Sequence, residues 1–126
     1  MAEKQQINWV DMVVANPKAL AEFYAAVVGY TLDPCPEGNG NTSYSLIDSH
    51  SKEAFGICDK NSFPNWTGGW VLYIEVDNFE ERVARIAEHG GEIVGHWPSE
   101  VGRRAECLFR DPSGAGVMLQ EANEPG

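Results

Sequence analysis

The sequence predicts an α+β protein built from two βαβββ modules with a cleft between them. The first observation is a repeat: residues 7–29 hold an aliphatic run and then a helical pattern ending at glycine, and residues 70–90 follow the same plan. The second is that about three short strand-like runs, separated by turn residues, come after each helical pattern. We therefore expect a single domain over residues 1–126, made of module 7–59 and module 70–121 joined by linker 60–69.

The first helix is predicted between Asn16 and Gly29. Asn16 followed by Pro17 is typical of a helix start, and Gly29 is typical of a helix end. The apolar residues recur at spacings of three and four, which predicts one apolar stripe facing the sheet. The stripe consists of Leu20, Phe23, Tyr24, Val27 and Val28.

The second helix is predicted to begin near Asn78 and to end at Gly90 and Gly91. Its apolar stripe is predicted to contain Phe79, Val83, Ile86 and Ala87. Both predicted helices are short and amphipathic, so each is expected to lie on a sheet. The remaining strands are predicted over Thr31–Cys35, Ser43–Leu46, Ala54–Cys58, Glu92–Trp97, Ala105–Phe109 and Gly116–Gln120.

Composition excludes several classes of function. The net charge of −10 disfavours nucleic-acid binding, because phosphates would be repelled. No apolar run approaches the roughly 20 residues that cross a bilayer, and the N-terminus lacks the apolar stretch of a signal peptide. Three widely spaced cysteines fit a reducing compartment better than a disulfide framework. We expect a cytoplasmic protein that binds neither nucleic acid nor membrane.

Four pieces of sequence, in this order and spacing, resemble the vicinal oxygen chelate superfamily, which contains glyoxalases, bleomycin-resistance proteins, fosfomycin-resistance enzymes and extradiol dioxygenases. They are the strand ending at Asn16, the motif Glu22-Phe23-Tyr24 leading to Val28-Gly29-Tyr30, the segment Tyr73-Ile74-Glu75-Val76-Asp77 with Gly90-Gly91, and Phe109-Arg110-Asp111-Pro112-Ser113-Gly114. The resemblance covers residues 7–121. It implies a glyoxalase-like domain in which paired βαβββ modules form a curved mixed sheet around a cavity or cleft, commonly assembled as a homodimer.

The same resemblance implies a divalent metal held by His, Glu or Gln from four strands. On an ungapped reading those positions fall on Trp9, Ile57, Val71 and Met118. Indole and aliphatic side chains offer no lone pair, and a lone thioether is a poor ligand for zinc, iron or manganese. The sequence therefore predicts no metal site and no cofactor.

Strand alternation predicts which residues line the cavity instead. Val10, Met12 and Val14, with Leu72, Ile74 and Val76, are expected beneath the helices, together with Val117 and Leu119. The opposite faces predict a mixed ligand-binding pocket of aromatic, aliphatic and polar groups. The predicted ligand-binding residues are Trp9, Asp11, Phe55, Ile57, Val71, Tyr73, Glu75, Met118 and Gln120.

Each assignment has a plainer alternative. Trp9 can fill the space that relatives give to a metal, and Tyr73 can hydrogen-bond a neighbouring carboxylate with no ligand involved. Asp11 and Glu75 are candidates for a general acid–base pair, or else lie at a wet rim or a dimer contact. Arg103 and Arg104 are interpreted as solvated loop residues; the alternative is that they cover the cleft and hold an anion.

Three functions remain open. The first is a metal-independent glyoxalase-like protein that binds a small organic molecule of cationic or aromatic character, with no reaction assigned; an enzyme would be a lyase or isomerase. The second is a drug-sequestering protein that resembles the bleomycin-resistance group, which shares the pattern running from Gly102-Arg103 to Arg110-Asp111-Pro112-Ser113-Gly114. The third, a metal-dependent lyase, isomerase or dioxygenase, is disfavoured by the missing ligands.

Overall fold

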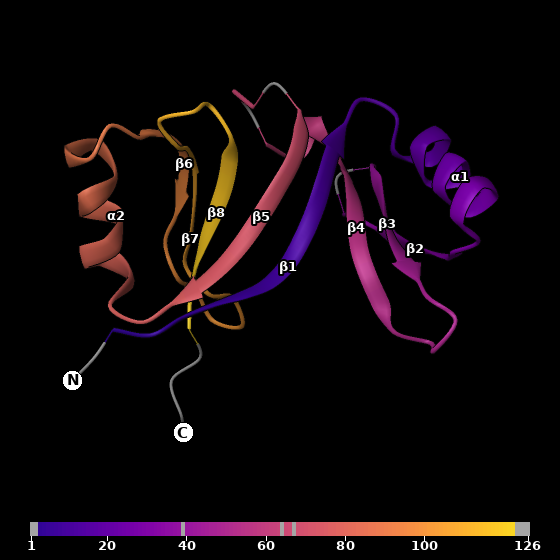
Figure 1. The fold of residues 1–126 in the computed structure, drawn as a ribbon, viewed down its shortest axis with the longest axis horizontal. Helices are drawn as coiled ribbons and strands as arrows, with labels where there is room; N and C mark the ends of the chain where they lie inside the picture. Colours follow the sequence, from indigo (N-terminus) through magenta and orange to yellow (C-terminus); the bar gives the residue numbers. More distant parts are fainter. Residues whose placement is uncertain (1–2, 39, 64, 67, 123–126) are drawn as a thin grey trace. The chain divides into compact units, whose positions relative to one another are not determined.

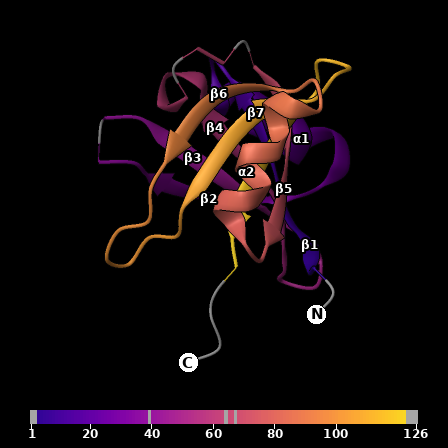
Figure 2. The same cartoon turned by 90° about the vertical axis from the view of Figure 1, so that its left-hand side faces the viewer.

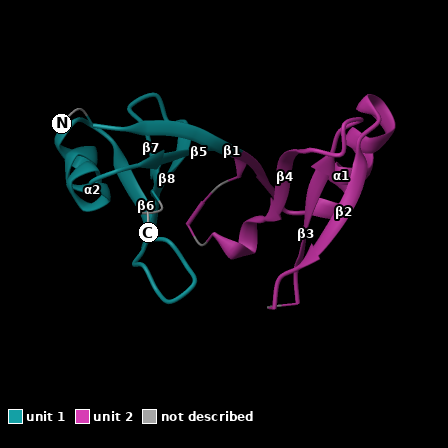
Figure 3. Cartoon of the chain, turned by 90° about the horizontal axis from the view of Figure 1, so that it is seen from below, with its two compact units in different colours: residues 1–9, 71–126 teal, residues 10–70 magenta. Residues whose placement is uncertain are grey.

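A computed structural model describes residues 3–38, 40–63, 65–66 and 68–122. The described residues form two α-helices, a short 3₁₀ helix (η1, Lys60–Ser62) and eight strands in the hydrogen-bonded order β2-β3-β4-β1-β5-β8-β7-β6 (Figure 1). This arrangement confirms the predicted α+β class and the repeated βαβββ plan. The chain divides into two compact units: residues 1–9 with 71–126 form unit 1, and residues 10–70 form unit 2 (Figure 3).

Unit 2 contains the second half of β1 (Gln5–Val14), then α1 (Pro17–Val28), β2 (Thr31–Pro36), β3 (Thr42–Ile47) and β4 (Glu53–Asp59). β1 pairs with β4 in parallel, while β3 is antiparallel to both β2 and β4. The Asn16 side chain accepts a hydrogen bond from the Ala19 N–H, and Gly29 ends α1 in the left-handed conformation with φ of 98°. The predicted start and end of this helix are confirmed because both capping groups satisfy backbone atoms that the helix leaves unpaired.

Unit 1 contains the first half of β1, then β5 (Gly69–Val76) from Val71 onward, α2 (Phe79–Glu88), β6 (Glu92–Trp97), β7 (Glu106–Arg110) and β8 (Gly116–Glu121). β5 pairs with β8 in parallel, and β7 is antiparallel to β6 and β8. The parallel pair thus joins the first and last strands of the plan, as it does in unit 2. Figure 2 shows α2 lying in front of the strands of this unit.

The core of unit 1 lies between α2 and its sheet. Phe79, Val83 and Ile86 of α2 form one buried cluster with residues of β5, β7 and β8 and with the residue just before β7, namely Val76, Ala105, Cys107 and Leu119, and Ile74 and Phe109 pack against it. The predicted helix-facing positions Ile74, Val76 and Leu119 are therefore confirmed. Ala87 is exposed, so its place in the predicted stripe is wrong.

The core of unit 2 contains Ala21 of α1, Leu46 and Ile57, with Met12, Val14, Leu20 and Tyr24 among the partly buried residues around it. The prediction for Met12, Val14, Leu20 and Tyr24 is confirmed. The predicted stripe of α1 is wrong at its other members, because Phe23, Val27 and Val28 are 53%, 66% and 58% exposed. These exposed residues follow the same spacing of three and four as the buried ones. Periodicity alone therefore did not show which part of the apolar stripe of α1 faces the sheet and which part faces solvent.

The predicted face of β4 is also wrong. Phe55 packs against the cluster that holds Ile57 and Ala21, so both β4 residues lie on the α1 side of the sheet. The register explains this, because Ile57 stands opposite Met12 and Gly56 stands opposite Asp11. Gly56 and Cys58 therefore share the face of Asp11 and Val13. Phe55 and Ile57 are core residues here and do not line a pocket on the other face.

Candidate functional site

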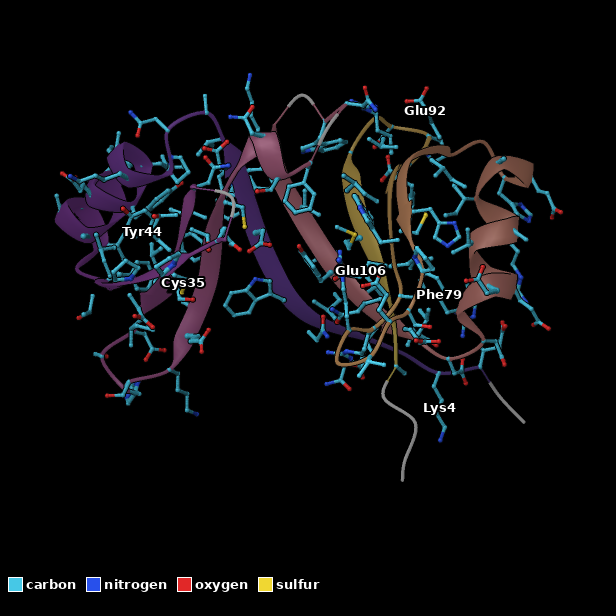
Figure 4. All side chains as sticks on the ribbon, turned by 180° about the vertical axis from the view of Figure 1, so that it is seen from behind. Lys4, Cys35, Tyr44, Phe79, Glu92 and Glu106 are labelled. Atoms are coloured by element: carbon cyan, nitrogen blue, oxygen red, sulfur yellow. The ribbon has the colours of Figure 1, made fainter. Side chains whose placement is uncertain are left out.

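The face of unit 1 that is turned away from α2 carries a row of polar side chains. Glu75 of β5 stands opposite Gln120 of β8, and Gln120 stands opposite Glu106 of β7. These residues alternate with Ile74, Cys107 and Leu119, which pack in the α2 core. Figure 4 labels Glu106 and Phe79, which lie on opposite sides of the sheet, with Phe79 on the α2 side. The fold thus aligns three polar groups across three neighbouring strands.

Hydrogen bonds join this row into one network. The Asn8 amide of β1 donates to Gln120 Oε1 at 2.8 Å and to Glu75 Oε2 at 3.3 Å. The Gln120 amide in turn donates to Glu106 Oε2 at 3.0 Å. We call Asn8, Glu75, Glu106, Gln120 and Arg104 the polar row. Its members fix one another's orientation, because each amide donor already has a carboxylate or amide oxygen as its acceptor.

Arg104 completes the row from the loop between β6 and β7. Its Nη1 lies 2.8 Å from Glu75 Oε2 and donates a second hydrogen bond to the Glu121 carbonyl oxygen at 3.3 Å. The two charged side chains are 31% and 28% exposed, so the ion pair is only partly screened by water. The loop itself is closed by reciprocal backbone hydrogen bonds between Glu100 and Arg103.

A hollow of about 570 Å³ lies beside the polar row and shares Arg104 with it. Its volume falls in the range of small-molecule sites. The hollow is open, and its walls carry charges of both signs. The residues around it are Ser99, Glu100, Gly102, Arg103, Arg104, Glu121 and Ala122.

The apolar residues predicted for this face are packed. Tyr73 and Met118 stand opposite each other in β5 and β8, and Leu108 stands opposite Met118. Tyr73 is 8% exposed, while Val71, Met118 and Leu108 are 0–1% exposed. They form a buried floor beside the polar row, so Glu75 and Gln120 are the predicted residues of unit 1 that present polar atoms at the surface. Trp9 is partly buried and next to Asn8, whose amide contacts Glu75.

The remaining predicted residues belong to unit 2. Asp11 is 5% exposed, and its carboxylate accepts a hydrogen bond from the Cys58 thiol on the neighbouring strand. Burial, together with the negative charge of Asp11, raises the pKa of Cys58 far above its usual value. Cys58 is therefore a neutral thiol rather than a reactive thiolate. Phe55 and Ile57 lie in the α1 core, as described above.

The residues present do not fit a metal ion. The implied positions Trp9, Val71 and Met118 offer indole, aliphatic and thioether groups, and the corresponding face of β4 offers Gly56 and a protonated Cys58. Among the described residues no group of three or more His, Cys, Asp and Glu side chains could hold a metal ion.

Sequence reasoning missed three members of the polar row. In β7, Cys107 and Phe109 face the α2 core, so the alternation of the strand places Glu106 on the opposite face. The sequence pattern could therefore have identified Glu106 as a member of the polar row. Arg104 was interpreted as a loop residue, because a loop sequence does not show which carboxylate it reaches. Asn8 is next to Trp9, and strict alternation assigns adjacent residues to opposite faces, so its contact with Glu75 was not predictable.

Comparisons with known proteins agree with this architecture. A family model described as "Glyoxalase-like domain" matches residues 9–119. Two proteins named "Putative glyoxylase CFP32", from Mycobacterium bovis and Mycobacterium tuberculosis, are each 28% identical over 120 residues, or 92% of this chain. The chain spans 45% of the length of these relatives. No helix in the described part of the chain is long and apolar enough to cross a membrane.

Solved structures share the fold at low sequence identity. A hypothetical protein from Bacillus halodurans is 16% identical with a TM-score of 0.60, covering 97% of both chains. Methylmalonyl-CoA epimerase from Mycobacterium tuberculosis is 15% identical with a TM-score of 0.56, covering 94% of this chain and 88% of the other. A 2,2',3-trihydroxybiphenyl 1,2-dioxygenase from Sphingomonas wittichii is 14% identical with a TM-score of 0.52, covering 92% of this chain and 42% of the other.

These structural neighbours are all under 25% identical to this chain, so they show similarity in fold alone. The match over residues 9–119 identifies the family itself: this chain belongs to the glyoxalase-like domain family.

Proposed function

We propose that this glyoxalase-like protein binds a small organic molecule without a metal ion, at the polar row of unit 1 and the hollow beside it. The observation that carries the proposal is the network joining Arg104, Glu75, Asn8 and Gln120 on a helix-free sheet face. The hollow of about 570 Å³ beside this network has the volume of a small-molecule site, and the network supplies fixed polar groups of the kind that orient a ligand.

The charges of the row favour a neutral or cationic ligand. Glu75 is compensated by Arg104, whereas Glu106 accepts only the neutral Gln120 amide among the hydrogen bonds described here. The row therefore has one carboxylate more than it has guanidinium groups. A ligand amine or hydroxyl would find carboxylate and amide oxygens there as acceptors.

Metal independence is supported by donor chemistry. The positions at which the family would hold a cation carry Trp9, Val71 and Met118, and Val71 and Met118 are each 1% exposed. A metal would need imidazole, carboxylate or thiolate in place of these groups.

Sequestration of a basic aromatic drug is the alternative. In this alternative, Trp9 and Tyr73 would stack on the aromatic drug. Asp11 and Glu75 would pair with its positive charge. Tyr73 is only 8% exposed, and the Glu75 carboxylate is already paired with Arg104. Stacking on Tyr73 would require the floor of the face to open, so the observed contacts favour a small polar molecule over a large aromatic drug.

A thermal-shift screen of EDTA-treated protein tests the proposal. The probes are benzylamine, benzamide, benzoate and bleomycin, which differ in charge and size. A ligand of the native state present at about 100 times its Kd stabilises the protein by about 2.7 kcal/mol, so its binding raises Tm. We expect benzylamine or benzamide to raise Tm more than benzoate does.

Two glutamine variants locate the response. Glu75→Gln should abolish the shift, whereas Glu92→Gln should leave it intact, since Glu92 also pairs with an arginine but lies on β6 outside the row. A panel that gives no shift, or an equal loss in both variants, would contradict the proposal. A shift that appears only after zinc, iron or manganese is restored would contradict metal independence.

A further inference from the structure

The N-terminal half of β1 carries a donor of the polar row but has no buried side chain to hold it in place. Residues 5–8 are all exposed. Asn8 nevertheless donates to Glu75 and to Gln120. A strand that buries neither face has a weakly specified register against its neighbour, which here is β5. A slip of two residues would move the Asn8 amide by about 7 Å, out of reach of both acceptors.

A set of contacts fastens the chain just before this stretch. The Lys4 N–H donates to Asp77 Oδ1 at 3.0 Å, and the Lys4 carbonyl oxygen accepts from the Asp77 N–H at 3.3 Å. Arg82 Nη2 donates to the same Lys4 carbonyl at 3.0 Å and to Asp77 Oδ1 at 2.6 Å. Lys4 thus lies beside the turn between β5 and α2, and both polar groups of its backbone are bonded (Figure 4).

Glu3 extends these contacts onto α2. Its carboxylate accepts from Arg85 through both oxygens, at 3.1 and 2.9 Å, and lies 3.2 Å from Arg82 Nε. We call Glu3, Lys4, Asp77, Arg82 and Arg85 the clasp. The hydrogen bond from Arg85 lowers the pKa of Glu3, and the hydrogen bond from the Lys4 N–H lowers the pKa of Asp77. Both carboxylates are therefore charged at neutral pH, which favours the closed clasp.

The corresponding positions in the other copy of the repeat are apolar. Counted from the residue that precedes each helix, three residues of unit 2 stand where the clasp has its charges: Ala15 for Asp77, Leu20 for Arg82 and Phe23 for Arg85. These charges are therefore not part of the common plan of strand and helix. They occur in the unit that also receives the N-terminal half of β1.

We propose that the clasp positions Asn8, so that Glu3 and Asp77 act on ligand binding from outside the site. This inference rests on the proposed function, because it takes the polar row as the place where the ligand binds. With the clasp closed, the register of β1 brings the Asn8 amide to its two acceptors. With the clasp open, residues 5–8 slip or detach, and the row loses the donor that orients those acceptors. By linkage, a ligand that needs the complete row also tightens the clasp.

Nitrogen-15 NMR of the ligand-free protein tests the positioning. Glu3→Gln removes the charge that the two arginines bind, and Asp77→Ala replaces the acceptor of the Lys4 N–H by the residue that the other copy carries. We expect each variant to move the Asn8 side-chain amide resonance toward that of a solvated amide and to speed its hydrogen exchange. Glu92→Gln is the matched control, because it removes an arginine-paired carboxylate on β6, and it should leave the Asn8 resonance unchanged.

Calorimetric titration with benzamide tests the consequence for binding. Benzamide is neutral, so a change in the net charge of the protein has no long-range effect on it. Asn8→Ala should raise Kd about two- to tenfold, as expected for the loss of a neutral hydrogen bond. Glu3→Gln and Asp77→Ala should raise Kd by up to that factor, and neither should have any effect in the Asn8→Ala background. A residue that only stabilised the fold would have the same effect in both backgrounds.

The outcomes separate this inference from the proposed function. An Asn8 amide resonance that neither clasp variant moves, or a loss of affinity that is equally large in the Asn8→Ala background, would overturn the positioning role and leave the proposed site standing. A wild-type chain that does not bind benzamide would count against the proposed site, and the Asn8 resonance would then decide for or against the clasp. Circular dichroism shows whether Asp77→Ala remains folded; if it does not, Glu3→Gln, at an exposed residue, provides the comparison.

Discussion

Replacing Arg104 by alanine tests whether the polar row is an energetic unit or a set of solvated side chains. Arg104 donates to Glu75 Oε2 at 2.8 Å and to the Glu121 carbonyl at 3.3 Å, and the ion-paired side chains are 31% and 28% exposed. A fully exposed pair contributes about 0–1 kcal/mol, and a hydrogen bond to a charged group about 1.5–3 kcal/mol. Because the Arg104–Glu75 pair is partly exposed, we expect Arg104→Ala to lower the free energy of unfolding by a value between these two ranges, about 1–2 kcal/mol.

The assay is urea and thermal unfolding of Arg104→Ala, Glu75→Gln and the double variant. For a chain of this length, a loss of about 1–2 kcal/mol lowers Tm by roughly 3–8 °C. The double-mutant cycle should give a coupling energy of about 1 kcal/mol. Arg103→Ala is the control, because no ion pair of Arg103 is found among the described residues, and it should change stability by less than about 0.5 kcal/mol.

Equal losses for Arg103→Ala and Arg104→Ala, or a coupling energy near zero, would refute this reasoning. Either result would mean that Arg104 is solvated in solution, as the loop sequence alone suggested. The polar row would then lack the rigidity on which the proposed binding site depends.

Three further predictions concern a partly buried thiol, a buried thiol and a tight turn. Native protein at pH 8 should react slowly with a thiol reagent at Cys58 and Cys107, because burial raises the pKa of both thiols. Mass spectrometry measures the labelling rate, and fast labelling of either cysteine would be inconsistent with the fold. Burial and the nearby charge of Glu80 raise the pKa of Cys107 to about 11, above its usual value of 9.0. The folded state therefore holds the thiol proton more tightly than the unfolded state does, and the stability that this provides is complete below pH 9 and declines as the pH rises to 11. The stability difference between wild type and Cys107→Ala should therefore shrink by up to about 2 kcal/mol over that window, and a constant difference would show that the folded state does not hold the proton. In a urea titration, Gly91→Ala should destabilise the protein by about 1–3 kcal/mol, because a Cβ there would lie 2.7 Å from Ile86 Cγ2. Gly38→Ala is the control and should leave stability unchanged, because a Cβ at Gly38 would meet no atom within 4 Å.

The repeat and the helix boundaries could be predicted because local chemistry determines them. Asn16 and Gly29 satisfy the ends of α1 wherever the helix lies. At α2 the C-cap is His89, followed by Gly90 in the left-handed conformation, and the Gly91 N–H donates to the Ile86 carbonyl. The period of two in β5 and β8 correctly assigned Ile74, Val76 and Leu119 to the α2 core. These are local signals that need no knowledge of the neighbouring strands.

The faces of β4 and α1 depend on contacts that are distant in sequence. Ile57 lies under α1 because the parallel register places it opposite Met12, and loop lengths do not reveal that register. Phe23 and Val27 continue the apolar periodicity of α1, yet they are exposed in the described chain. The apolar stripe was therefore wider than the surface that the sheet of unit 2 covers.

The candidate site was predictable only in part for the same reason. Alternation identified Glu75 and Gln120, whose neighbours Ile74 and Leu119 have a clear burial preference. It could not show that Arg104 reaches back from a loop to neutralise Glu75, or that Asn8 connects β1 to β5 and β8. Loop and edge contacts of this kind depend on the conformation of the whole unit.

The most direct test of metal-free binding at the polar row is a nitrogen-15 NMR titration of EDTA-treated protein with the most stabilising compound of the screen. The account predicts saturable shifts of the Asn8 and Gln120 side-chain amides and of Arg104 Nε–H, with Arg110 Nε–H unchanged beside Glu92. Shifts confined to residues outside the row, or binding that begins only when a divalent metal is added, would contradict it.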